Sequence, residues 1–159
     1  MPNLKTLQRF IKVMPRLPIA YMQLRKAVVD LAAHTDLFYL HDRPDCAQSF
    51  ANTGESLLNS ANRWHEAVRI AARFVAPKVE CLPKAVALSR ILRQRQMPAV
   101  LKLGVAKSES RLLSHAWIEI GGIAIGESTH TLARYRPIDA DDWLPIYSNN
   151  NVAKPSTEK

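Results

Sequence analysis

The stretch that decides the fold of this chain is residues 81–106, which read CLPKAVALSRILRQRQMPAVLKLGVA. Apolar residues recur at helical spacing from residue 81 or 82 to residue 94, and this pattern predicts a helix. Pro98 separates that helix from residues 99–106, where apolar side chains alternate as in a half-buried strand. The apolar side chains that share one face of the predicted strand are Leu101, Leu103 and Val105.

The chain before this stretch is predicted to be helical. Amphipathic patterns indicate helices over residues 4–14, about 19–34, and 55–75. Pro15 and Pro18 are expected to end the first of them, because proline is disfavoured inside a helix. The N-terminal half should therefore supply helices that pack on the element starting at residue 81.

The chain after this stretch is predicted to continue as antiparallel strands. A polar turn over residues 107–111 leads to a strand over 113–120, and a further strand is expected over 123–127. Helices followed by such strands indicate the α+β class, with a helical N-terminal half packed on a core in which a Cys-bearing helix precedes an antiparallel sheet. The expected organisation is one domain over residues 1–148 and a flexible tail over 149–159. Within the domain, residues 1–76 would form the helical half and residues 77–148 the Cys/His core.

Composition narrows the class of protein. The chain has 159 residues, of which 47% are hydrophobic, as in an ordinary globular domain. Its 22 basic and 14 acidic side chains give a net charge of +8, which favours acidic partners. There is no recognisable nucleic-acid motif, so nucleic-acid binding is not expected. We also expect no membrane span and no secretory signal, and hence a cytoplasmic protein whose cysteines, Cys46 and Cys81, are free thiols.

Cys81 and His115 are the two side chains that a cysteine hydrolase requires. A thiol at a helix start is favoured as the nucleophilic thiolate by the positive end of the helix dipole. Pro83 suits the first turn of such a helix, where its missing N–H costs nothing. An imidazole on a neighbouring strand could take the thiol proton and return it to a leaving amine. The prediction depends on whether Cys81 and His115 meet in the folded chain.

The register of the second hairpin decides which residue lies opposite His115. A three-residue loop over residues 120–122 would pair His115 with Glu127 and would place Trp117 opposite Ile125, on one face that excludes water. A two-residue turn would instead place Ser128 opposite His115. We favour the first register, because it brings a carboxylate to the imidazole.

The segments 81–99, 101–105 and 115–119 together resemble the lasso-peptide maturation proteases, a family of transglutaminase-like (papain-like) cysteine peptidases. The resemblance covers about residues 81–138. It implies that Cys81 is the nucleophile and His115 the general base. The acidic third member falls at Glu127, where the family usually has Asp. The alternatives for this role are Asp139, Asp141 and Asp142.

The resemblance also implies an activity and partners. The protein would remove the leader from a ribosomally made lasso-peptide precursor, without a metal or other cofactor. It would act with a separate, small leader-binding protein and possibly with the lasso cyclase. Nothing in this chain resembles the leader-binding module, so the chain resembles the stand-alone protease component.

Several residues allow a second interpretation. Lys84, Arg90 and Arg93 make the central helix basic, which is typical of a solvated face but also of a docking surface for an acidic peptide. Trp117 is a further candidate for substrate or partner contact.

The chain could also be a non-catalytic module that binds peptide. Cys46 is expected to be dispensable. The histidines without metal-ligand spacing to the cysteines are His34, His41, His65 and His130.

Overall fold

The computed structural model describes residue 8 and residues 11–33, 54–76, 78–109 and 111–138. Its elements are the 3₁₀ turn η1 (Met14–Arg16), the helices α2 (Leu17–Ala32), α3 (Glu55–Val75), α4 (Cys81–Gln94) and α5 (Thr129–Leu132), and the strands β1 (Ala99–Ser108), β2 (Arg111–Ile120), β3 (Ile123–Ala124) and β4 (Arg136–Ile138). Helices precede an antiparallel sheet, which confirms the predicted α+β class.

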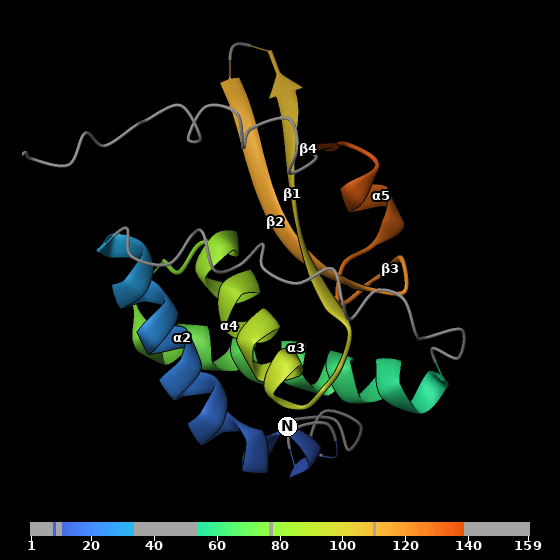
Figure 1. Cartoon of the computed structure of the whole chain (residues 1–159). Coiled ribbons are helices and arrows are strands. Elements are labelled where there is room, and N and C mark those ends of the chain that lie inside the picture. The colour runs from blue at the N-terminus through green and yellow to red at the C-terminus, as the bar shows by residue number, and fades with distance from the viewer. Residues whose placement is uncertain (1–7, 9–10, 34–53, 77, 110, 139–159) are drawn as a thin grey trace, which may run out of the picture.

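The long helices α2 and α3 lie beside α4, and the strands β1 and β2 extend away from this group of helices (Figure 1). The strand order is β3-β2-β1-β4, and every neighbouring pair is antiparallel. Helix α4 packs against α2 and α3 and also against β1 and β2. It is therefore the central element of the fold, as the opening stretch of sequence predicted.

The hydrophobic core lies where α4 meets its neighbours. Every residue of α4 from Ala85 to Ser89 is buried, and so are Ile91 and Leu92. A helix covered by helices on one side and by a sheet on another must be apolar around most of its surface. The other large, fully buried side chains of the core are Leu24, Val68, Ile118, Ile120 and Ile125.

Polar side chains connect the helices at the edge of this core. The Arg90 guanidinium of α4 lies 2.7 Å from a carboxylate oxygen of Asp30 on α2. The indole of Trp64 on α3 lies beneath two guanidinium groups, with Arg95 at 3.9 Å and Arg16 at 5.4 Å from the ring centroid. These cation–π contacts connect α3 to the end of α4 and to η1.

The two prolines near the N-terminus do not separate two helices as predicted. Residues 11–13 are helical, and the chain continues through η1 directly into α2. Pro15 and Pro18 each lie in the first turn of their element, where no intrahelical N–H bond is required. The predicted helix over 4–14 falls largely outside the described residues.

The favoured register of the second hairpin is wrong. Ile120 pairs with Ile123 and Glu119 with Ala124, so Gly121 and Gly122 form a two-residue turn. Both glycines have positive φ angles of 57° and 76°, which this kind of turn requires. As a result Ile125, whose N–H bonds the Ile118 carbonyl at 2.9 Å, joins the buried core and does not lie opposite Trp117.

Strand β3 ends at Ala124 and does not reach residue 127 as predicted. The backbone leaves the extended conformation at Gly126, whose φ angle of 75° lies in the left-handed region. Glu127 therefore follows the sheet without belonging to it, and Ser128 caps the short helix α5 by accepting from the Thr131 N–H at 3.1 Å. The sequence patterns did not predict α5 or β4, because elements of four and three residues carry too little periodicity.

No helix in the described ranges is long and apolar enough to cross a membrane. The predicted tail over residues 149–159 lies outside those ranges.

Candidate active site

Cys81 is the first residue of α4, at the N-terminal end of a 14-residue helix. The N-cap residue, Glu80, forms no side-chain hydrogen bond to the helix start, and the first turn contains no acidic residue. Cys81 therefore lies at the positive end of the helix dipole, directly after the acidic residue Glu80. The thiol is free and half-buried against the core.

His115 lies on β2, on the side of the sheet away from the buried core residues of that strand. Its neighbours Ala116 and Ile118 enter the core, so alternation turns His115 and Trp117 to the opposite face. The imidazole stacks on Trp117 with 6.0 Å between ring centroids and packs on Tyr135 at 5.1 Å. Two aromatic rings therefore restrict its orientation.

Glu127 supplies a carboxylate to this imidazole. Its Oε1 atom lies 3.2 Å from Nε2 of His115, and both side chains are about one-fifth exposed, at 23% and 18%. Nε2 is buried and forms no aligned hydrogen bond within the described ranges, so the contact is a close electrostatic approach rather than a directed bond. The structure thus brings Glu127 to His115 although the register that predicted this contact is wrong.

The turn that carries Glu127 lies against a second imidazole, which sequence reasoning did not place in the site. A Cβ added to Gly126 would overlap the ring of His65 on α3, with Nδ1 and Cε1 nearest. Burial lowers the pKa of His65 from its ordinary value, although the Glu127 charge acts in the opposite direction. No spacing in the sequence indicates this approach, because His65 and Gly126 come from distant segments.

The other predicted contact residues have partners or are covered. Trp117 is only 4% exposed, and its Nε1–H donates to Glu119 Oε1 at 2.8 Å. Arg90 pairs with Asp30, and Arg93 also has an interaction partner. Lys84 is half-buried on the first turns of α4. At least two of the three side chains of the predicted basic docking surface are thus already engaged by other groups.

Some predicted residues lie outside the described ranges. These are Cys46 and the alternative acids Asp139, Asp141 and Asp142. Among the residues that the structure does describe, no group of His, Cys, Asp and Glu side chains could hold a metal ion.

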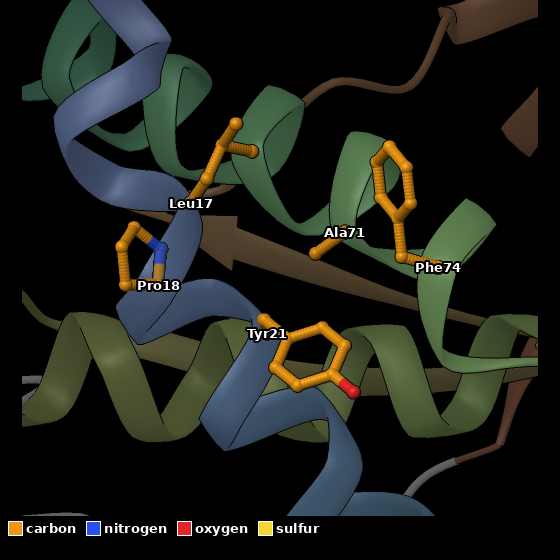
Figure 2. Close-up of a pocket in the computed structure, with 5 residues that line it drawn as sticks. All are labelled: Leu17, Pro18, Tyr21, Ala71 and Phe74. Carbon is orange, nitrogen blue, oxygen red and sulfur yellow. The ribbon is translucent and has the colours of Figure 1, made fainter.

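An apolar pocket lies elsewhere on the molecule, between α2 and α3 (Figure 2). The rings of Tyr21 and Phe74 stand on either side of Ala71, and Leu17 and Pro18 complete the lining. None of the predicted site residues lines this pocket.

The family comparison matches the model of the transglutaminase-like superfamily over residues 24–140, which is most of the chain. The chain belongs to the transglutaminase-like superfamily. This match spans the Cys-bearing helix, both strands of the long hairpin and the turn that carries Glu127. The superfamily includes cysteine peptidases. The comparisons with curated proteins and with solved structures found no significant match.

The superfamily assignment gives the geometry a chemical interpretation. The structure brings His115 and Glu127 together and adds Trp117, Tyr135 and His65 around them. It also packs α4, which begins at Cys81, against β2, which carries His115. Within the described ranges the thiol forms no hydrogen bond to the imidazole. Their approach remains a prediction.

Proposed function

We propose that this protein is a cysteine peptidase that removes the leader from a lasso-peptide precursor. One observation carries the proposal: the carboxylate of Glu127 lies 3.2 Å from the imidazole of His115. Membership of the transglutaminase-like superfamily supports a cysteine peptidase. The resemblance of residues 81–105 and 115–119 to lasso-peptide maturation proteases supports the substrate.

The reaction follows from the chemistry of the three side chains. The Cys81 thiolate attacks the scissile carbonyl, and a tetrahedral oxyanion forms. The amide C–N bond then breaks, the leaving amine takes a proton from His115, and the acyl group stays on sulfur as a thioester. Water, activated by the same imidazole, attacks the thioester and releases the carboxylic acid and the thiol. No metal or nucleotide enters these steps.

The position of Glu127 assigns the two nitrogens of His115. We assign the proton of the neutral ring to Nε2, because the Glu127 carboxylate oxygen lies 3.2 Å from that atom and would accept from it once the two groups align. Nδ1 is then the nitrogen that exchanges a proton with the Cys81 thiol. Glu127 stabilises the imidazolium that forms, as the acidic member of a catalytic triad does.

The partners in this proposal are the precursor peptide, a separate small leader-binding protein and the lasso cyclase. The chain itself resembles only the protease component, so leader selection would depend on the leader-binding protein. We therefore expect cleavage to be fastest when that protein is present.

Cleavage of a precursor is the direct test. The full chain, alone and with a leader-binding protein, is incubated with peptides translated from the small open reading frames that flank its gene, and products are identified by mass spectrometry. Cys81→Ala should abolish cleavage, because it removes the sulfur that forms the thioester, and Cys46→Ala should leave cleavage intact. Equal cleavage by the two variants would refute the assignment of the nucleophile.

Alkylation separates a peptidase from a module that only binds peptide. An activated thiolate reacts with iodoacetamide faster and at lower pH than an ordinary thiol. Cys81 should therefore be labelled before Cys46 in the same molecule, as measured by mass spectrometry. Equal labelling of the two cysteines, together with binding of precursor but no cleavage, would favour the binding module.

A further inference from the structure

His65 lies at the junction between the Cys81 helix and the turn that carries Glu127. It comes from the middle of α3, and its ring occupies the space that a side chain at Gly126 would need. Lys84, three residues after Cys81 on α4, and Glu127 both act electrostatically on this imidazole. His65 therefore packs against the Glu127 turn and lies within electrostatic range of the first turn of the Cys81 helix.

The backbone around Glu127 has little support from the sheet. The last ladder bond on this side runs from the Ile125 N–H to the Ile118 carbonyl, and the next capping contact begins at Ser128. Gly126 and Glu127 lie between these two points, and Gly126 has a left-handed φ of 75°. A glutamate also has three side-chain torsions to order before its carboxylate can meet an imidazole. The side chain that lies against this turn comes from outside the sheet, from His65 on α3.

We propose that His65 is a positioning residue: its imidazole packs against Gly126 and thereby holds Glu127 where its carboxylate reaches His115. The close approach adds to the left-handed φ as a reason for glycine at residue 126, since any Cβ there would displace the ring. The inference rests on the proposed function for its catalytic meaning, but the placement of Glu127 can be tested by itself.

The charge state of His65 suits this role. The charged groups that act on it are Glu127, Glu66, Arg69 and Lys84. Burial outweighs the two carboxylates and lowers the pKa of His65, so the ring is neutral near neutral pH. A neutral ring packs against the turn without forming an ion pair with Glu127, and the carboxylate stays available to the His115 imidazolium.

The test compares two substitutions of His65 with a control histidine. His65→Ala removes the ring, whereas His65→Asn keeps an amide where Nδ1 lies, the atom nearest to Gly126. Alanine is the better helix former, so a defect confined to His65→Ala does not come from helix propensity. His130→Ala, at an exposed position of α5, is the matched control for the loss of an imidazole.

The readout is the rate of Cys81 alkylation by iodoacetamide from pH 5 to 9, with Cys46 as the internal reference. A displaced Glu127 weakens His115 as the partner of the thiolate. We expect about a tenfold slower reaction near pH 6.5 in His65→Ala, which corresponds to a rise of about one unit in the thiol pKa. The rate at pH 9, where thiolate formation no longer limits, should be unchanged. His65→Asn and His130→Ala should follow the wild-type profile.

Two results would overturn the proposal: a wild-type profile in His65→Ala, or a loss in His65→Asn equal to that in His65→Ala. A crystal structure of His65→Ala tests it without any reactivity, and we expect the carboxylate to leave His115. A Glu127 carboxylate still 3.2 Å from Nε2 in that variant would overturn it too. Wild-type Cys81 that reacts no faster than Cys46 would refute the proposed function instead, and the crystal structure would still decide the role of His65.

Discussion

Gly104→Ala is a sharp test of how the fold holds the candidate site. Gly104 on β1 pairs with His115 on β2. A Cβ at this position would lie 2.9 Å from two ring atoms of Trp117 and 3.1 Å from the Cβ of Tyr135. These are the two aromatic residues that pack on the His115 imidazole. The added methyl group would therefore overlap sterically with both Trp117 and Tyr135.

Two opposing effects set the size of the change in stability. Alanine in a strand is usually more favourable than glycine by about 0.5–1 kcal/mol, because it loses less backbone entropy on folding. Overpacking a closed site costs about 1–3 kcal/mol. The steric effect should dominate, because the Trp117 ring is only 4% exposed and cannot turn away into solvent. We expect a net loss of about 1–2 kcal/mol in the free energy of unfolding.

Urea denaturation, followed by far-UV circular dichroism, measures this loss. Gly54→Ala is the control for steric contact, because a Cβ at Gly54 meets no atom within 4 Å, and any loss from this N-cap position of α3 should be additive with Trp117→Phe. Its φ of −63° also suits alanine. The double variant Gly104→Ala/Trp117→Phe should recover about 1 kcal/mol relative to the sum of the single changes, since the smaller ring vacates the contact. The reasoning fails if Gly104→Ala is as stable as the wild type, or if the two changes are additive.

Two further predictions concern the core and the pH dependence of stability. Ile91→Ala should lower the free energy of unfolding by about 2–5 kcal/mol, because Ile91 is 0% exposed and the change leaves a cavity. Ile123→Ala, at 49% exposure, should change it by less than about 0.5 kcal/mol, and equal effects in urea titrations would contradict the described core. Burial lowers the pKa of His65 below 6.5, so the unfolded chain binds this proton at higher pH than the folded chain does. Wild-type stability should therefore fall, relative to His65→Asn, as the pH drops through 6.5 towards the lowered pKa; a relative gain would contradict the sign.

The sequence predicted the long elements well because each carries several turns or alternations of pattern. Residues 55–75 and the helix beginning at Cys81 appear with the predicted limits. Strand β2 was predicted from residue 113 and begins at Arg111. The break at Pro15 and Pro18 was wrong, since both prolines lie where a helix tolerates them.

The site was predicted less completely than the fold. The contact between His115 and Glu127 appears, but it forms outside the strand ladder through the left-handed turn at Gly126. Reasoning from the pairing of two strands could not predict this route to the contact, because it assumes that both strands extend beyond the paired residues. The resemblance of the Cys81 and His115 segments to a peptidase family indicated the superfamily, and the family match confirms that coarser assignment.

By itself, the sequence determined the class of the fold, the apolar helix that starts at a cysteine, and the strand that carries the histidine. These features follow from local periodicity and residue chemistry, which can be read from each short segment of the sequence alone. Only the tertiary structure decided that His65 lies against Gly126 and that Trp117 and Tyr135 enclose His115. Such contacts join segments far apart in the chain and form only after α3, β2 and the turn before α5 have packed together. A contact between distant side chains produces no periodic pattern in the sequence, so sequence patterns could not predict it.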